Sequence, residues 1–356
     1  MAIGDMKTNR IYWIDLLRGL AIFLVVYGHI LMFYQYQGIQ LPTIRFIYSF
    51  HMPLFFFISG FVSFKEKRQW NLFSFFQFIK NKTIYLLIPS TLFFLIYILV
   101  NRLNFTDSIY DKFKAGYWFT FVLFLFYIIY STCCFLGQKI TLKVKNIPIG
   151  SFLLLSIAAI TTYLLSISYP TEGNAAHKPY LLFSVEYWSN FTFFAVGILA
   201  RKYDNYFFHF IFNRFFLAIA LYISFSTAVF WGFIPNNLQI PLKGTLSYLL
   251  TPLSSVFILV VLFITKEKLV VKTKIGKSLL FTGQRTMDIY FIHYFFLPDK
   301  TIALNFLSSH YSLLYEIIIS SSLAVCVIII SLAFSEILRL SPILSTLLLG
   351  VKKNKN

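Results

Sequence analysis

An arginine and a histidine lie in one apolar stretch near the N-terminus, IDLLRGLAIFLVVYGHILMF, which runs from Ile14 to Phe33. Arg18 and His29 are eleven positions apart, which on an α-helix is about 1100°, roughly 20° past three full turns. The two side chains therefore share one face, about 16 Å apart along the axis, and Asp15 lies one turn before Arg18. An imidazole suits general-base catalysis because its unperturbed pKa of about 6.5 is near working pH.

Simpler interpretations of these residues stay open. Arg18 can extend its head to the lipid headgroups, and Asp15 with Arg18 also suits a simple ion pair. His29 is harder to explain in this way, because it lies well inside the stretch among aromatic and branched residues. Polar groups inside a membrane span usually face a protein interior or a water-filled cavity, since lipid offers them no partners.

Three more titratable residues lie at a similar depth in other apolar stretches: His51 in SFHMPLFFFISGF, His293 in DIYFIHYFF, and Glu316. With His29 they predict one layer in the outer third of the membrane. His51, beside Pro53, is equally compatible with a helix-capping or core histidine. Three histidines and a glutamate also suit zinc, but no two share an HxxxH or HxxH spacing, so no metal is expected.

The composition of the chain indicates an integral membrane protein. Its 356 residues are 58% hydrophobic and 12% charged, whereas average soluble chains are about 45–50% apolar and roughly 25% charged. The net charge of +18 comes from short Lys and Arg clusters between apolar runs, as in helical membrane proteins. A lipid bilayer is therefore an expected partner and nucleic acid is not. The three cysteines lie in apolar runs and predict no disulfide framework.

Apolar runs of about 17–25 residues predict an all-α fold with about ten transmembrane helices. The expected spans are 11–34, 46–64, 83–101, 116–136, 148–168, 186–200, 213–233, 245–265, 280–298 and 311–338. One set of alternate connecting segments holds 23 Lys and Arg residues and the other holds 7. By the positive-inside rule both termini, residues 1–10 and 339–356, are expected in the cytoplasm. Because the loops are short, we expect a single membrane domain over residues 1–356.

The segments IYWIDLLRGLAIFLVVYGH and FHMPLFFFISGF resemble the start of membrane-bound acyltransferase family 3. The hallmark of that family is an arginine, ten residues and a histidine in the first span. Similar segments follow in order: TIYLLIPSTLFF, GYWFTFVLFLFYIIY, FTFFAVGILARKY and LLFTGQRTMDIYFIHYFF. The resemblance covers almost the whole chain, and it is nearest to the subgroup of fucose 4-O-acetylase-like and surface polysaccharide O-acetyltransferases.

This resemblance implies an O-acetyltransferase in the inner (cytoplasmic) cell membrane. Its donor would be cytoplasmic acetyl-CoA or another acyl-CoA, its acceptor a hydroxyl of a cell-surface or lipid-linked glycan, and it would bind no cofactor. His29 would be the essential base and Arg18 would support binding of the donor or substrate. Glu316 or Asp15 would orient an imidazole. His51 or His293 would hold the acceptor or stabilise the oxyanion.

Arg68, Lys80 and Lys82, before the third expected span, are expected to attract the phosphates of coenzyme A. The same residues are also explained by membrane topology alone. Relatives often have paired arginines where this chain has Lys80 and Lys82, and lysine lacks the planar bidentate fork of arginine. Relatives also often have a proline after the histidine of the ninth span, where Tyr294 follows His293.

Two other function classes stay open. A transporter or exporter also places polar residues inside the membrane, and a structural subunit of a polysaccharide assembly would tolerate loss of His29. Aromatic residues at the outer rim are compatible with stacking on sugars and with an interfacial aromatic belt: Trp118, Tyr187 and Trp188.

Overall fold

The computed structural model of the chain describes residues 11–35, 42–140, 143–144, 147–168, 178–233, 249–298 and 312–351. Helices dominate these ranges, as the composition predicts. The exceptions are two strands of two residues each, β1 (Lys143–Val144) and β2 (Ile147–Pro148), which pair in antiparallel orientation.

The chain divides into two compact units, each built from two separate stretches of sequence. The first consists of Met1–His51 and Phe210–Thr286, and the second of Met52–His209 and Met287–Asn356. Helices α2 (Pro42–Ser63), α10 (Asp204–Ile211) and α15 (Thr286–Ile292) each contribute residues to both units.

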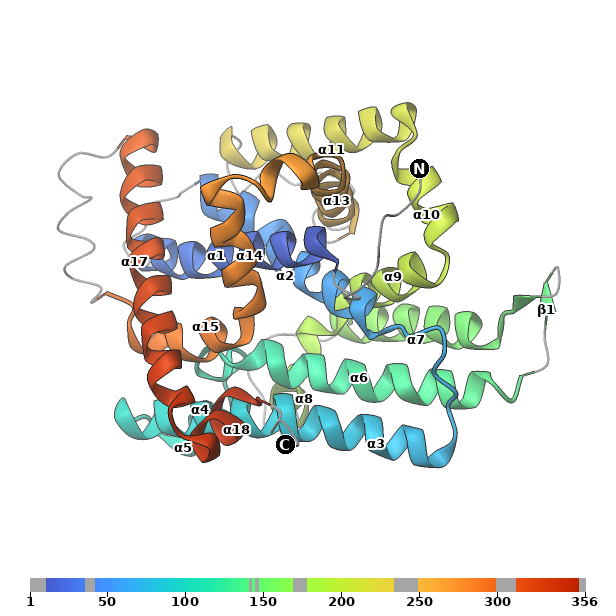
Figure 1. The fold of residues 1–356 in the computed structure, drawn as a ribbon, viewed down its shortest axis with the longest axis horizontal. Helices are drawn as coiled ribbons and strands as arrows, with labels where there is room; N and C mark the ends of the chain where they lie inside the picture. Colours follow the sequence, from blue (N-terminus) through green and yellow to red (C-terminus); the bar gives the residue numbers. More distant parts are fainter. Residues whose placement is uncertain are drawn as a thin grey trace. The chain divides into compact units, whose positions relative to one another are not determined.

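The first unit is organised around the N-terminal helix. Its other helices come from the middle of the chain, and in Figure 1 the blue α1 lies beside the orange α14. Helix α1 packs along α14 and α13, and α11 packs against α13. The helices completed within this unit are α1 (Tyr12–Gln35), α11 (Arg214–Phe233), α13 (Thr251–Val270) and α14 (Lys274–Gln284).

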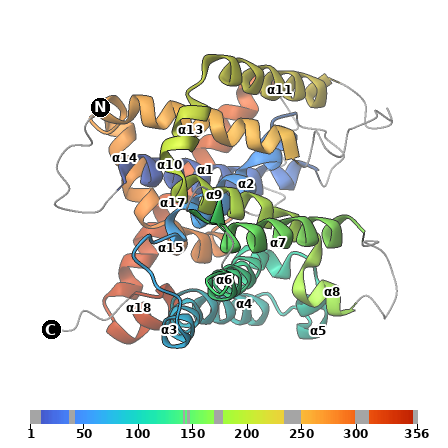
Figure 2. The same cartoon turned by 90° about the vertical axis from the view of Figure 1, so that its right-hand side faces the viewer.

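The second unit contains a layer in which α3, α6 and α7 lie side by side (Figures 1 and 2). Helix α18 packs on α4 and α17, and α17 also contacts the turn η6. Its elements are α3 (Leu72–Lys82), η1 (Thr83–Leu87), α4 (Ile88–Val100), α5 (Phe105–Tyr110), η2 (Lys114–Gly116), α6 (Trp118–Gly137), α7 (Gly150–Ile167), α8 (Lys178–Phe183), η4 (Val185–Asn190), α9 (Phe191–Lys202), α15 (Thr286–Ile292), η6 (His293–Phe295), α17 (Leu313–Arg339) and α18 (Pro342–Leu349).

Among the described residues, six helices are long and apolar enough to cross a membrane. They are Tyr12–Met32, Phe46–Ser63, Leu72–Val100, Trp118–Gly137, Gly150–Ile167 and Leu313–Arg339. A bent pair, Asp204–Ile211 with Arg214–Thr227, forms a further candidate with a 68° bend. These helices correspond to the first five expected spans, the seventh and the tenth. The total of ten spans and the cytoplasmic position of both termini stay predictions.

The third expected span, 83–101, begins earlier in the structure than the sequence predicts. A helical stretch runs from Leu72 to Val100 and passes through the π-helical turn η1, where the Ile88 N–H bonds to the Thr83 carbonyl. Pro89 follows directly and has no N–H to continue the regular ladder, and a π-bulge is a common way to absorb such an interruption.

The expectation of single helices over 186–200 and 280–298 is wrong. The first of these ranges is divided between the 3-10 turn η4 and α9. The second is divided among the end of α14, the short α15 and the 3-10 turn η6. The break at Arg285 has a local cause: the Thr286 hydroxyl donates to the Gly283 carbonyl at 2.7 Å, while the backbone of Arg285 leaves the helical conformation.

Candidate functional site

Helix α1 carries the arginine and histidine predicted to do chemistry. It runs without a break from Tyr12 to Gln35, so the helical geometry expected for Arg18 and His29 holds, with both on one face and about 16 Å apart along the axis. His29 is half-buried. The two residues therefore stand at different depths of the same rigid element.

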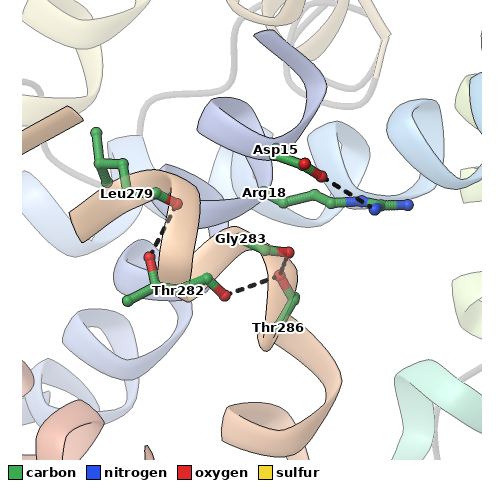
Figure 3. A network of polar contacts seen from close by, with 6 residues as sticks. All are labelled: Asp15, Arg18, Leu279, Thr282, Gly283 and Thr286. Atoms are coloured by element: carbon green, nitrogen blue, oxygen red, sulfur yellow. Dashed lines mark hydrogen bonds and ion pairs between the residues drawn. The ribbon is translucent and has the colours of Figure 1, made fainter. Parts of the chain in front are cut away.

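Asp15 and Arg18 form an ion pair on the first part of α1. Arg18 Nη1 lies 3.5 Å from Asp15 Oδ1, and the Arg18 side chain is 33% exposed while that of Asp15 is 8% exposed. Figure 3 shows the Arg18 side chain extending away from α14. A pair this open contributes about 1 kcal/mol or less to stability, so orientation of the guanidinium is its larger effect.

Helix α14 fixes this part of α1 through direct backbone contact. A Cβ added at Gly283 would lie 1.9 Å from the Asp15 carbonyl oxygen, and one added at Gly19 would lie 2.1 Å from the Leu279 carbonyl oxygen. Both positions therefore require glycine. The hydroxyl of the half-buried Thr282 donates to its own helix, at the Leu279 carbonyl (Figure 3), so this polar group is satisfied within α14.

Tyr48 on α2 connects the outer part of α1 to His51. Its ring edge would lie 2.8 Å from a Cβ at Gly28, the residue before His29, and its ring centroid is 4.7 Å from that of His51. The phenol is 38% exposed. Sequence reasoning missed Tyr48; the available signal was an aromatic residue one helical turn before His51.

His51 is held in one tautomer. Its ring is buried, and Nδ1 lies 2.8 Å from the Ile47 carbonyl oxygen. Since a carbonyl can only accept, Nδ1 carries the proton and Nε2 of the neutral ring is an acceptor. The first unit thus contains two of the predicted histidines, and Tyr48 of α2 lies against α1 at Gly28.

His293 in the second unit has the same arrangement. The ring has no exposed surface, and Nδ1 lies 3.0 Å from the Ile289 carbonyl oxygen, so Nε2 is again the acceptor nitrogen. The Tyr294 ring lies beside it, with centroids 4.1 Å apart and planes tilted by 38°. Its hydroxyl donates to the Gly116 carbonyl at 3.2 Å, a contact that a proline at position 294 would not make.

Glu316 is buried in the first turn of α17, where the helix dipole favours a negative charge. Sequence reasoning missed a second buried acid in this unit, Asp288 on α15, which pairs with Arg339 on α17 at 2.5 Å. The signal was an acidic residue within an expected span, which is rarely placed there without a partner.

Two of the three predicted donor-binding cations come together around one ring. The Arg68 guanidinium lies 4.8 Å from the Phe78 ring centroid, and Lys82 Nζ lies 5.5 Å from it. Lys82 also lies 3.6 Å from the centroid of Tyr127. Such cation–π contacts hold the charges in place. Lys80 is exposed and does not join this cluster.

The predicted site residues are shared between the two units. Asp15, Arg18, His29 and His51 belong to the first, and Arg68, Lys80, Lys82, His293 and Glu316 belong to the second. A single layer of titratable groups therefore stays a prediction. Among the described residues, no three His, Cys, Asp or Glu side chains gather as metal ligands.

Comparisons with known proteins identify the family. Residues 11–336 match the model of the acyltransferase family 3 domain, described as an acyltransferase domain. The chain is also similar to nodulation protein NolL of Mesorhizobium japonicum, with 33% identity over 134 residues. That alignment covers 34% of this chain and 35% of the relative, about a third of each. No solved structure matches significantly. The chain is a multi-pass membrane protein and belongs to acyltransferase family 3.

Proposed function

We propose that this acyltransferase moves an acetyl group from cytoplasmic acetyl-CoA to a hydroxyl of a cell-surface or lipid-linked glycan. The observation that carries the proposal is the position of Arg18 and His29 on one face of the unbroken helix α1, inside the region that matches the family. The proposed setting is the inner cell membrane, crossed ten times, with both termini in the cytoplasm as the 23 to 7 distribution of basic residues favours.

His29 acts as the general base in this proposal. It takes the proton from the glycan hydroxyl as the oxygen attacks the thioester carbonyl. The new C–O bond forms, the C–S bond breaks, and the proton is passed to the departing coenzyme A thiolate. General-base assistance of this kind is worth about 10² to 10⁴ in rate. The half-buried imidazole suits this role because part of its surface stays accessible to a substrate.

Arg18 acts on the donor side. At about 16 Å from His29 along the helix it is too far to contact the same atom, so we assign it to the donor arm. Asp15 orients its guanidinium through the ion pair. Arg68 and Lys82 provide fixed positive charge for the phosphates of coenzyme A, and the exposed Lys80 adds to the attraction at longer range.

His51 and His293 are assigned to the acceptor. Because Nδ1 of each ring is committed to a backbone carbonyl, the neutral ring offers only an acceptor at Nε2. This supports a hydrogen bond from a glycan hydroxyl in preference to stabilisation of an oxyanion, which needs a donor. Glu316, buried at the start of α17, is assigned to orient a neighbouring group.

One observation favours the transporter alternative. The pair α10 and α11 is bent by 68° at a short break, and broken helices are frequent at the binding sites of transporters. A transporter would move its substrate without an acyl donor, whereas the proposed enzyme would modify glycan only when acetyl-CoA is supplied.

The central test is His29→Ala, compared with His209→Ala as a matched control. His209 is exposed on α10 and has no assigned role. Each variant is expressed in a strain lacking the gene, its membrane level is measured by immunoblot, and O-acetyl signals of the surface glycan are measured by proton NMR. We expect normal insertion for both, transfer reduced by about 10² to 10⁴ for His29→Ala, and unchanged transfer for His209→Ala.

Full activity of His29→Ala would remove the assigned role. Inverted membrane vesicles supplied with labelled acetyl-CoA on the cytoplasmic face separate the two function classes. Labelled glycan supports the enzyme, and export of unmodified glycan without any donor supports the transporter.

A further inference from the structure

Two further cations of the second unit lie near the pair formed by Arg68 and Lys82. Arg201 and Lys202 are consecutive residues in the last turn of α9, and the side chains of both are half-buried. The Arg201 guanidinium lies 5.4 Å from the ring centroid of Phe61 on α2. Neither residue takes part in the steps assigned above to the other cations.

Close backbone contact between α9 and α2 fixes the position of Arg201. A Cβ at Gly197, one helical turn before Arg201, would lie 2.9 Å from the backbone nitrogen of Phe61. At the end of α2, the carbonyl of Ser63 accepts from Arg68 Nη1 at 3.4 Å. The last turn of α2 therefore contacts Arg201 through the ring of Phe61 and Arg68 through a carbonyl two residues later.

Helix α6 connects Lys202 to the same group of residues. Cys134 lies near the end of α6, and the charges of Arg68 and Lys202 both act on its thiol. One turn earlier on α6, the ring of Tyr130 packs against that of Phe78, with centroids 6.0 Å apart. Phe78 is the ring that also contacts the cations of the first pair. We name the following residues the four-cation cluster: Arg68, Lys82, Arg201 and Lys202.

The four-cation cluster has no acidic partner among the described residues. None of its members forms an ion pair with a carboxylate there, although Glu66 and Asp204 lie only two positions from Arg68 and Lys202 in the sequence. The charges rest on aromatic faces, and such contacts fix a charge without neutralising it. Like charges repel, and partly buried ones are screened less than exposed ones. The cluster is therefore best stabilised by a bound anion.

An anion with several phosphates fits this cluster better than one with a single charge. Arginine binds phosphate through two parallel hydrogen bonds and lysine binds it as a point charge, and the cluster contains two residues of each type. Coenzyme A carries a diphosphate and a separate phosphate on its ribose. Since all four side chains are half-buried and not fully covered, they remain accessible to such a ligand.

We infer that Arg201 and Lys202 of α9 complete the donor site, and that the four-cation cluster binds the diphosphate and the ribose phosphate of coenzyme A. This inference rests on the acetyl-CoA donor proposed above, and it adds to that proposal two residues from a helix with no assigned role. Phosphate is also present in the headgroups of anionic lipids, so the experiment has to separate these two sources.

The test variants are Arg201→Gln and Lys202→Gln, with Arg214→Gln as the matched control. Arg214 is an exposed arginine at the start of α11, thirteen positions after Arg201, and it reports the effect of one positive charge fewer. Binding of free coenzyme A to the full chain in neutral detergent is measured by isothermal titration calorimetry. We expect the Kd to rise about 10-fold in each test variant, as loss of one charge-assisted hydrogen bond predicts, and to stay unchanged in Arg214→Gln.

A fourth variant, Arg201→Lys, separates loss of charge from loss of structure. It keeps the positive charge and removes the planar fork of arginine, so its Kd for coenzyme A should lie between those of the wild type and Arg201→Gln. A Kd as high as that of Arg201→Gln in this variant, together with a wild-type Kd in Lys202→Gln, would mean that Arg201 supports only the packing of α9. That result would overturn the inference.

Phosphatidylglycerol provides the lipid arm of the experiment. The rise in Tm on adding this lipid to the detergent is measured for each protein, and we expect the same rise in the wild type and in all variants. A smaller rise in Arg201→Gln and Lys202→Gln, with an unchanged Kd for coenzyme A, assigns the cluster to lipid headgroups and overturns the inference.

The outcomes separate this inference from the proposed function. Equal affinity of the wild type and both test variants for coenzyme A overturns the inference alone, and so does an equal loss of affinity in Arg214→Gln. A wild-type protein that binds no coenzyme A overturns both proposals. Binding that depends on the cluster, without labelled glycan from acetyl-CoA, supports the inference and overturns the proposed acceptor.

Discussion

Two regions of the molecule are held in place by different kinds of contact. One is the backbone contact between α1 and α14, and the other is the tyrosine clamp, in which the hydroxyls of Tyr290 and Tyr294 donate to the Gly116 carbonyl. Each holds a candidate catalytic or binding side chain in place. At Gly283 and Gly19 the absence of side chains lets two helix backbones touch, and Arg18 is oriented because the helix that carries it cannot shift. At the clamp, hydroxyl groups reach across from α15 and η6 to Gly116, and a short turn is made rigid by side-chain bonds.

The comparison indicates that a long helix is held in place by close packing, whereas a short one depends on specific hydrogen bonds. Helix α1 has 24 residues and satisfies its own backbone, so close packing is sufficient to place it. Helix α15 has seven residues and is followed by a 3-10 turn, so its position depends on specific polar contacts. Backbone contacts tolerate no added atom, whereas hydroxyl contacts are lost one at a time, and the two regions should respond differently to mutation.

The largest effect is expected for Gly283→Ala. In an exposed helix this change would stabilise by about 1 kcal/mol. Here the new Cβ would lie 1.9 Å from the Asp15 carbonyl oxygen and 3.0 Å from the Gly19 backbone nitrogen, and backbone atoms cannot move aside cheaply. We expect a loss of about 3 kcal/mol or more of stability, seen as a lower yield of monodisperse protein and a lower Tm in detergent.

Gly28→Ala is the matched control for that change. Its Cβ would meet the ring edge of Tyr48, which is partly exposed and able to rotate. A smaller loss of Tm than for Gly283→Ala is expected. Equal losses in the two variants would contradict the distinction between backbone and side-chain contact.

A moderate effect is expected for Asp288→Asn, which tests the support of α15 at its other end. The substitution leaves Arg339 without its carboxylate partner. Breaking a fully buried ion pair costs about 3–5 kcal/mol. Because the Arg339 side chain is 25% exposed, we expect a loss of about 2 kcal/mol in the free energy of unfolding, measured as a shift in Tm.

The comparison variant for this pair is Asp15→Asn in the first unit. Its partner Arg18 is more exposed, at 33%, and the distance is longer, at 3.5 Å, so the expected loss is below about 1 kcal/mol. If Asp15→Asn destabilised as much as Asp288→Asn, the first unit would depend on polar contacts to the same extent as the second.

The parts of the fold that the sequence predicts are the long apolar helices. The first span and the tenth have local signals, because an apolar run of about 20 residues indicates a membrane-spanning helix. In the first span, the spacing of Arg18 and His29 then places both side chains on one face of that helix. The break between α14 and α15 has no such signal. The hydroxyl bond from Thr286 to Gly283 accompanies it, but threonines also make such bonds inside unbroken helices, and the packing of Gly283 against α1 joins residues that are far apart in the sequence.

The clamp was beyond prediction for the same reason. Its hydroxyl bonds join residues 174 and 178 positions apart, and no periodicity in one sequence reports such pairs. Lys114 illustrates the limit. In the sequence it is one of the seven basic residues in the segments expected outside the cytoplasm, and nothing there indicates that it is buried. In the structure it is 6% exposed, because its ammonium group is occupied by two backbone carbonyls.

The last effect is expected only at alkaline pH and comes from the titration of Lys114, which tests whether burial of its ammonium group costs stability. Burial lowers the pKa of Lys114 to about 8, although the nearby carboxylates of Asp111 and Glu186 act to raise the pKa. The unfolded chain keeps the ordinary pKa of about 10.4. Below pH 8 both states bind the proton, and above it the unfolded state binds more. Stability should therefore rise with pH between about 8 and 10.4.

Lys114→Met lacks this titration, so its Tm should not show the rise, whereas the control Lys112→Met should follow the wild type. Lys112 is the exposed neighbour in the same loop, and other lysines and tyrosines titrate equally in both variants and cancel in the comparison. Parallel Tm curves from pH 7 to 10.5 for all three proteins would mean that the Lys114 ammonium group is solvated in the folded chain and not held by the two carbonyls. The turn at Lys114, Ala115 and Gly116, where all three residues have positive φ, would then be held by the tyrosine hydroxyls alone.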